Sequence, residues 1–358
     1  MKISEFANSS GEWLKGQGPD SDVVISSRIR LARNLVSFFF LPKCTDAQKC
    51  QIVETVSKVL HRVDPKLNFL RLDQAEDIDR QVLVERHLIS RQHAGQTGAR
   101  LVAFSPDERL AVMINEEDHL RIQVIRSGLQ FEQAWAQIDQ FDDRLEEHLD
   151  YAFDAQFGYL TACPTNVGTG LRISAMLHLP GLRLTRELDR VFRAAKDMRL
   201  AVRGLYGEGT EAVGDFFQIS NQITLGYAER EIVSDFSERV VPPMVAYERK
   251  ARRSLLQDHV RELDDKVFRA AGLLRNARVM GAKETLSLLS HLRIGIALER
   301  IRGVEMDTVN DLLLQTQPAH LQQLQGQSSE GGQMSAVQRR IVRAEVIRSR
   351  LNGFEAKG

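Results

Sequence analysis

The sequence lacks several features that would place a protein in a common class at once. No apolar run reaches the roughly 18 residues that a membrane-spanning helix needs, and residues 1–17 lack the basic and then apolar order of a signal peptide. Lysine and arginine together number 48, as do aspartate and glutamate, so no net charge attracts nucleic acid or an anionic membrane. We therefore expect a cytoplasmic protein that binds neither nucleic acid nor membrane.

Cysteine is scarce as well. Cys44, Cys50 and Cys163 have no metal-binding spacing and cannot all pair with one another, which is typical of a reducing compartment. We expect Cys44 and Cys50 to be small buried hydrophobic residues. The Gly-x-x-x-x-Gly-Lys-Ser/Thr loop and the protein-kinase signatures are both missing, so a Walker-type nucleotide site is not expected.

The hydrophobic pattern changes along the chain. Thr45 and Gln48 form a capping box that predicts a helix to about His61, and apolar spacing predicts further helices over 131–149 and 185–199. Alternating apolar residues predict strands at 100–104, 110–115, 119–125, 200–203 and 217–225. From about Glu229 onward the pattern is helical throughout. The pattern therefore predicts an α+β domain followed by an all-α domain.

Four segments carry the residues that could perform chemistry. They are Ser-Ser-Arg-Ile-Arg at 26–30, Asn-Glu-Glu-Asp-His-Leu-Arg at 115–121, Cys-Pro-Thr-Asn-Val-Gly-Thr-Gly-Leu-Arg at 163–172 and Arg-Gly-Leu-Tyr-Gly-Glu-Gly at 203–209. Their glycines allow tight turns and close approach to a ligand, and their arginines present rigid forks to oxyanions. Together these segments favour a site that holds a polyanion beside a cation.

In their order and spacing the four segments resemble the ATP:guanido phosphotransferase family, and above all its bacterial protein-arginine kinase branch (McsB type). Members of the family move a phosphoryl group from ATP to a guanidinium nitrogen. The resemblance implies a catalytic domain over residues 1–250, built on an antiparallel sheet flanked by helices. It also implies an all-α C-terminal domain over residues 251–358 that mediates dimerisation.

The same resemblance implies which residues line the nucleotide site and how Mg²⁺ is held. The metal is expected to be bound mostly by the nucleotide and water, with no protein metal site. His93 is a rival for the role given to His87, because a lone histidine in an apolar helix is usually structural. The implied residues are Ser26, Ser27, Arg28, Ile29, Arg30, His87, Arg121, Arg172, Ile173, Ser174, Ala175, Met176, Arg203, Gly204, Leu205, Tyr206, Gly207 and Glu208.

The acceptor requires a base, because a guanidinium has a pKa above ~12 and its nitrogen must lose a proton as it attacks. By resemblance, the carboxylates that orient the guanidinium and take this proton are Glu117 and Glu208. Cys163 matches the reactive cysteine of the family, which as a thiolate would act electrostatically. Glu116 and Asp118 are alternatives to Glu117, and all three acids could instead form a solvated turn.

The position of the first motif bears on the acceptor. The small-molecule kinases of the family carry a helical domain before this motif, whereas here it begins at Ser26. Twenty-five residues cannot build such a domain, so the guanidinium pocket should be open to an arginine side chain on a polypeptide. Protein arginine is the favoured acceptor, and free arginine is the alternative within the same class of enzyme.

The C-terminal region contains a variant of a phosphoarginine-binding motif, Arg-Asp-x-x-Arg-Ala. The corresponding residues are Arg339, Arg340, Arg343 and Ala344, with Arg340 in place of the aspartate. A basic surface helix is the competing interpretation. The resemblance further implies an activator protein, a Clp ATPase–protease that degrades marked proteins, a regulated repressor and a homodimer. A non-catalytic phosphoarginine-binding adaptor is the alternative of another class.

Overall fold

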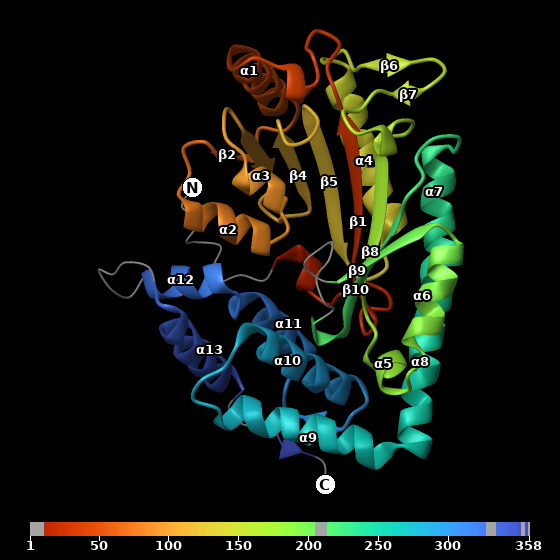
Figure 1. Cartoon of the computed structure of the whole chain (residues 1–358), viewed down its shortest axis with the longest axis vertical. Helices are drawn as coiled ribbons and strands as arrows, with labels where there is room; N and C mark the ends of the chain where they lie inside the picture. The colour runs from red at the N-terminus through yellow and green to blue at the C-terminus, as the bar shows by residue number, and fades with distance from the viewer. Residues whose placement is uncertain (1–10, 205–212, 327–333, 352–354, 357–358) are drawn as a thin grey trace.

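The computed structural model describes residues 11–204, 213–326, 334–351 and 355–356. Its centre is an eight-stranded sheet in the order β2-β3-β4-β5-β1-β8-β10-β9, in which every neighbouring pair is antiparallel (Figure 1). Its strands are β1 (Val24–Arg33), β2 (Asn68–Arg71), β3 (Leu101–Phe104), β4 (Leu110–Ile114), β5 (Leu120–Ser127), β8 (Leu171–His178), β9 (Leu200–Gly204) and β10 (Phe216–Asn221). The predicted α+β class with an antiparallel sheet is thus confirmed.

Helices and short strands surround this sheet. Those up to residue 235 are α1 (Asp46–Val63), α2 (Asp77–Glu85), α3 (Arg91–Gly95), α4 (Phe131–Glu146), α5 (Pro180–Leu184), α6 (Leu188–Asp197), α7 (Glu229–Asp235) and the hairpin of β6 (Phe153–Asp154) and β7 (Gly158–Tyr159). The helical region after them contains α8 (Val241–Asp258), α9 (Val260–Asn276), α10 (Ala282–Ala297), α11 (Met306–Gln315), α12 (Pro318–Gly326) and α13 (Ala336–Arg350). It also contains one pair of two-residue strands, β11 (Ile301–Arg302) and β12 (Glu355–Ala356).

One face of the sheet forms the main hydrophobic core. Alternate residues of the central strands, such as Ile29, Ile122 and Ile173, are fully buried among the apolar side chains of α1 and α4. Helix α4 lies behind β5 and β1 in the view of Figure 1. Because side chains alternate across a strand, the residues between these positions must point to the other face. That second face is therefore available for polar residues.

The helical region packs against one end of the sheet. Its core includes Leu263, Leu289 and Leu312, and it continues without a break into Trp13 and Phe216 of the first domain.

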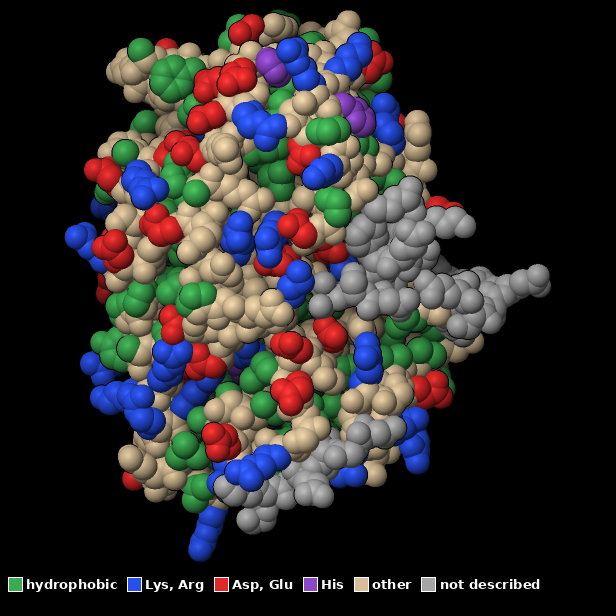
Figure 2. All heavy atoms as spheres, turned by 180° about the vertical axis from the view of Figure 1, so that it is seen from behind, with side chains coloured by type: hydrophobic (Ala, Val, Ile, Leu, Met, Phe, Trp, Pro, Cys, Tyr) green, Lys and Arg blue, Asp and Glu red, His purple; other side chains and the backbone are tan. Residues whose placement is uncertain are grey.

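The face turned away from the viewer of Figure 1 carries both acidic and basic side chains (Figure 2). Among the described residues, none of the helices combines the length and apolar character needed to cross a bilayer.

Local expectations from the sequence are confirmed for most elements and wrong at three points. Cys50 is exposed on α1 and Cys44 is only partly buried, so neither is the fully buried hydrophobic residue that was expected. His87 lies two residues after α2 with a φ of 59°, so it is not part of a helix. Strand β10 ends at Asn221 and does not continue to residue 225. The side chain of Asn221 there accepts from the backbone N–H of Ile173 and donates to the carbonyl of Leu171, which replaces the next backbone ladder bonds.

Candidate active site

Five arginines gather on the polar face of the sheet. Arg28 and Arg30 alternate on β1, and Arg30 pairs directly with Arg172 on β8. On its other side Arg30 pairs with Gln123 of β5, two residues from Arg121. Arg203 of β9 pairs with Gln218 of β10, which in turn pairs with Met176 of β8. Because residues paired directly across neighbouring strands share a face, Arg203 lies on the same face as the other arginines. Four of the predicted motifs thus meet on one surface.

This cluster carries more positive charge than its surroundings balance. Burial, together with Arg121 and Arg172, lowers the pKa of Arg28 to about 10. Burial and the neighbouring Arg28, Arg121 and Arg172 also lower the pKa of Arg30 well below its ordinary value. Shifts in this direction mean that adding negative charge would relieve the repulsion. The face therefore suits a polyanion such as a triphosphate.

Hydrogen bonds at the cluster leave donors for a ligand. The Nη2 of Arg28 donates to Gln218 Oε1 at 2.7 Å, and its Nε lies 3.5 Å from Ser174 Oγ. By contrast, the buried Nε of Arg30 has no hydrogen-bond partner among the described residues. A buried donor without a partner is costly unless a ligand or water accepts its proton. Arg30 is accordingly well placed to bind an anionic oxygen.

The acidic turn between β4 and β5 contains three carboxylates with different partners. Glu116 is almost fully buried and accepts hydrogen bonds from Arg121 at 2.6 Å and from Ser90 Oγ at 2.5 Å. Although burial opposes its ionisation, Arg121 and Ser90 hold the pKa of Glu116 below its ordinary value. Asp118 is also buried, and its Oδ1 accepts from Asn34 at 2.6 Å and from the backbone N–H of Ala162 at 2.7 Å.

Glu117 differs from both neighbours. Its side chain is half-buried, and its carboxylate accepts no hydrogen bond from any described residue. Burial raises the pKa of Glu117; Arg121 opposes this rise, and the nearby Asp118 and Glu116 add to it. A carboxylate with a raised pKa beside an arginine cluster is a candidate proton acceptor. The geometry thus favours Glu117 over Glu116 and Asp118 for that role.

The loop that contains Cys163 is tied to the same turn. The backbone N–H of Ala162 donates to Asp118 of the acidic turn, and Cys163 is the next residue in the chain. Its Sγ lies 3.0 Å from Thr165 Oγ1, and the residue is partly exposed.

Two glycines let this loop approach other backbone closely. A Cβ on Gly168, where φ is 112°, would lie 2.4 Å from the carbonyl oxygen of Thr224, and one on Gly170 would lie 2.6 Å from that of Ala32.

The opposite end of the face is lined by aromatic and polar groups. A small pocket there is bounded by Ser26, Arg28, Ser174 and Met176, all of them predicted site residues, together with His87 and Trp13. The ring of His87 meets that of Trp13 edge-on, with centroids 4.5 Å apart. Burial and the nearby Arg28 lower the pKa of His87 to about 3, so the ring is neutral. The sequence interpretation missed Trp13, which is one of two aromatic residues before the first motif and belongs to no recognisable pattern there.

Other predicted residues lie elsewhere. His93 is buried with its Nε2 3.3 Å from the carbonyl of Leu101, and it does not line this pocket. Ser27 donates to the carbonyl of Gly128 on the core side of β1. Gly204 is the last residue of β9 and pairs with Phe217 of β10. The residues Ile29, Ile173 and Ala175 belong to the hydrophobic core, and Leu205, Tyr206, Gly207 and Glu208 lie outside the described residues.

The arginines of the C-terminal motif have different environments within α13. Arg343 is buried, and it donates to the backbone carbonyls of Thr316 at 2.8 Å and of Met280 at 3.1 Å. Arg339 donates to the carbonyl of Met334, Arg340 is exposed and Ala344 is buried. Arg343 thus joins α13 to neighbouring elements, whereas Arg340 faces solvent.

A metal ion would find few protein ligands here. Within the described ranges, there is no group of three or more His, Cys, Asp or Glu side chains that could hold one. The arginine face, by contrast, offers an unpartnered buried donor on Arg30 for a phosphate oxygen. The residues present therefore fit the phosphate oxygens of a nucleotide.

Comparison with known proteins agrees with this geometry. Residues 50–251 match the family model of the ATP:guanido phosphotransferase C-terminal catalytic domain, and residues 260–358 match that of the protein-arginine kinase McsB C-terminal domain. A protein-arginine kinase of Geobacillus sp. (strain WCH70) is 44% identical over 362 residues, covering 100% of this chain and 98% of that protein. A second protein-arginine kinase, from Symbiobacterium thermophilum, is 43% identical over 351 residues, which cover 97% of this chain and 98% of that protein.

Solved structures show the same relationship at greater distance. The crystal structure of lombricine kinase superposes with a TM-score of 0.57 at 25% identity, covering 65% of this chain and 68% of that one. The family models, the full-length relatives and the arginine-lined sheet all point the same way. The chain belongs to the ATP:guanido phosphotransferase family, in its protein-arginine kinase branch.

Proposed function

We propose that this protein is an ATP-dependent protein-arginine kinase, which transfers the γ-phosphoryl group of ATP to arginine side chains of other proteins. The observation that carries the proposal is the arrangement of Arg28, Arg30, Arg121 and Arg172 on one sheet face, with Glu117 at its edge. Relatives named protein-arginine kinase, which match over nearly the whole chain, support the choice of acceptor.

The arginines supply what phosphoryl transfer needs most. Such a reaction depends on charge neutralisation and alignment, with little covalent chemistry for the protein to perform. Arg28, fixed by Gln218 and Ser174, and Arg121, fixed by Glu116, would hold phosphate oxygens in defined directions. Arg30 has a buried donor to offer. The neutral His87 and Trp13 would border the nucleoside end.

Glu117 would act on the acceptor. It would orient the guanidinium and accept the proton that the attacking nitrogen loses, a task made easier by its raised pKa. Glu208 is proposed as the second carboxylate by resemblance alone, because it lies outside the described residues. Cys163, beside the same turn, would stabilise the guanidinium electrostatically. Mg²⁺ would be held by phosphate oxygens and water, and we assign it no protein ligand.

Incubation with magnesium and γ-labelled ATP tests the proposal. An arginine-rich unfolded protein and free arginine would be offered separately. We expect acid-labile, alkali-tolerant label on arginine of the protein, with far less on the free amino acid. Preferential labelling of free arginine would support the small-molecule alternative. Binding of ATP with no transfer to either acceptor would indicate a non-catalytic adaptor and overturn the proposal.

Wider roles follow by resemblance. We propose that the protein works in the cytoplasm as a homodimer, that an activator protein stimulates it, and that its products are degraded by a Clp ATPase–protease or include a regulated repressor. Sedimentation analysis of the purified chain tests the dimer. Co-purification from native extract, with and without phosphoarginine as competitor, tests the other partners.

A further inference from the structure

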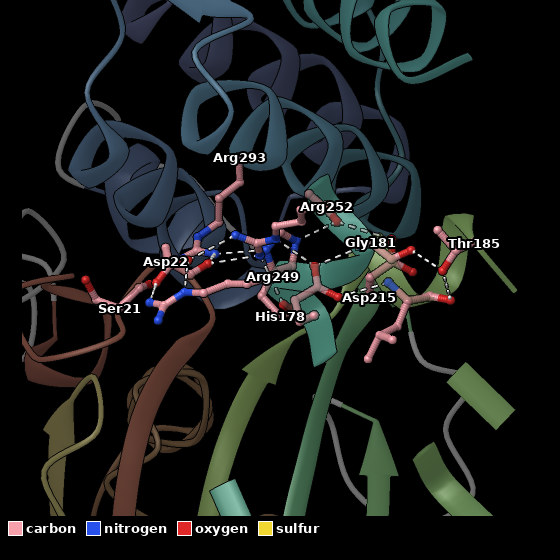
Figure 3. A network of polar contacts seen from close by, with 12 residues as sticks. Ser21, Asp22, His178, Gly181, Thr185, Asp215, Arg249, Arg252 and Arg293 are labelled. Carbon is pink, nitrogen blue, oxygen red and sulfur yellow. Dashed lines mark hydrogen bonds and ion pairs between the residues drawn. The ribbon is translucent and has the colours of Figure 1, made fainter. Parts of the chain in front are cut away.

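A buried polar network joins the ends of the site-bearing strands to the C-terminal helices. Asp22 lies just before β1, His178 is the last residue of β8, and Asp215 directly precedes β10. In Figure 3 these residues lie between the strands and helices α8 and α10, from which Arg252 and Arg293 point toward them. The proposed function uses none of these groups.

The hydrogen bonds of this network have a defined direction. Arg293 Nη1 lies 2.9 Å from the carbonyl oxygen of Asp22 and 2.8 Å from His178 Nδ1. Because a guanidinium can only donate, Nδ1 of His178 must accept, and its proton is therefore on Nε2. That nitrogen lies 2.8 Å from Ser290 Oγ, which in turn lies 3.4 Å from Asp215 Oδ2. The result is one chain of donors from Arg293 through His178 and Ser290 to Asp215.

A second set of contacts runs through α8. The carboxylate of Asp22 accepts from Arg249, with a shortest distance of 2.5 Å, and from Arg252 at 3.3 Å. Arg252 also donates to Glu248 Oε1 at 2.7 Å. Glu248, which has no exposed surface, accepts from the backbone N–H groups of Gly181 and Leu182 at the start of α5. Both helices are thus fixed to the strand ends.

The network is closed to solvent at its centre. His178 and Ser290 have no exposed surface, and Arg293 is 1% exposed. Burial and the nearby Arg293 and Arg252 lower the pKa of His178 well below its ordinary value, which keeps the ring neutral and able to accept from Arg293. Buried polar groups tolerate little displacement, since each loses its partner without gaining water. The relative positions of the three strand ends are therefore narrowly set.

Those strand positions matter at the nucleotide face. Arg28 on β1 contacts Ser174 on β8 and Gln218 on β10, so its orientation depends on the alignment of all three strands. They are the strands whose ends the network joins. His178 is four residues from Ser174, and Asp215 is three residues from Gln218, which at the rise of a strand correspond to roughly 13 Å and roughly 10 Å. A displacement at the network would be passed directly to the Arg28 contacts.

We infer that Ser290 and Arg293 of the C-terminal region are positioning residues for ATP binding, which act through His178 and Asp215 on the strands that hold Arg28. The inference rests on the proposed function in that it takes the arginine face to bind the nucleotide. It makes the helical region part of the nucleotide-binding unit, in addition to any role in dimerisation or in recognition of phosphoarginine.

Calorimetric titration of Mg-ATP into the full chain tests this inference without depending on an acceptor. Ser290→Ala removes the hydroxyl that connects His178 to Asp215. Arg293→Lys keeps the charge but loses the fork that reaches several acceptors. We expect each variant to raise the dissociation constant for ATP about tenfold. Steady-state kinetics with a protein acceptor, measured separately, should show that kcat at saturating ATP changes much less.

Two variants of the same helix serve as controls. Thr285→Val removes a buried hydroxyl that has no hydrogen-bond partner among the described residues, and Ile294→Val reduces core packing without touching the network. Both should leave ATP affinity unchanged, even where thermal unfolding shows a lower Tm. The inference is overturned if folded Ser290→Ala and Arg293→Lys bind ATP like the native chain, or if Ile294→Val weakens binding equally. Native protein that binds ATP but phosphorylates nothing would refute only the proposed function.

Discussion

Glu116 and Glu117 are adjacent in the chain, but their carboxylates have separate environments. That of Glu116 accepts from Arg121 at 2.6 Å and also from the backbone N–H of Glu117 at 2.9 Å. That of Glu117 accepts no hydrogen bond from the described residues, and burial raises its pKa, whereas the pKa of Glu116 is lowered. One acid therefore fixes an arginine of the sheet face, and its neighbour is the one that we propose to act on the acceptor.

Exchange of each acid for its amide should separate the two roles. We expect Glu117→Gln to lower kcat roughly 100- to 10,000-fold, the usual contribution of a general base, with ATP affinity largely retained. Glu116→Gln weakens the hold on Arg121 and should instead raise the KM for ATP. Steady-state kinetics with a protein acceptor and calorimetry with Mg-ATP measure both effects. Near-full activity of Glu117→Gln would exclude it as the base.

The pH dependence of kcat/KM should report the raised pKa of Glu117. The base must be ionised to accept a proton, so activity is lost as pH falls through its folded-state pKa. Because burial raises that pKa, the acidic limb should lie above the ordinary glutamate value of 4.5. Glu117→Gln should retain only a low rate that lacks this limb. A limb at or below 4.5 in the native enzyme would contradict the assignment.

Cys163→Ser should impair transfer without abolishing it, because the proposed thiolate contributes charge and forms no covalent bond. If the lost interaction stabilises the transition state by ~1.4 kcal/mol, kcat should decrease about tenfold. Thiol reagents should inactivate the native chain, and ATP with substrate should protect it. The exposed Cys50 would also react, so the labelling is best done in a Cys50→Ser background. Complete inactivity of folded Cys163→Ser would indicate a more direct role.

The sequence carried enough local information to place several site residues but not to bring them together. Alternation alone puts Arg28 and Arg30 on one face of a strand. It does not reveal that β1 lies between β5 and β8, which pairs Arg30 with Arg172 from 142 positions away. That pairing is set by which strands bury apolar surface together, a property of the whole domain and not of any segment.

Two local errors have physical causes as well. The pattern around His87 is apolar enough to suggest a helix, yet the backbone turns into the left-handed region there, and Gln123 donates to its carbonyl at 2.5 Å. Beyond Asn221 the alternation continues in sequence, but the Asn221 side chain has already taken the backbone partners that the next residues would need. In both cases a contact with a distant strand overrides the local preference.

The C-terminal motif allows a test that separates structure from sensing. Arg343 is buried and joins α13 to the carbonyls of Thr316 and Met280, so Arg343→Ala should cost roughly 1–3 kcal/mol of stability through unpaired carbonyls. Thermal unfolding would show this as a lower Tm. Arg340 is exposed on the same helix, and its replacement should leave Tm nearly unchanged.

Arg340→Asp would restore the acid of the family motif and supply a carboxylate to the guanidinium part of phosphoarginine. We expect it to tighten phosphoarginine binding by at most ~1.5–3 kcal/mol, the contribution of one charge-assisted hydrogen bond. Calorimetric titration of phosphoarginine into the native chain, Arg340→Asp and Arg340→Ala measures it, with Arg340→Ala as the control for lost positive charge. If none of the three binds, α13 has a structural role only. Tight binding by the native chain would mean instead that Arg340, in place of the family acid, does not weaken the binding of phosphoarginine.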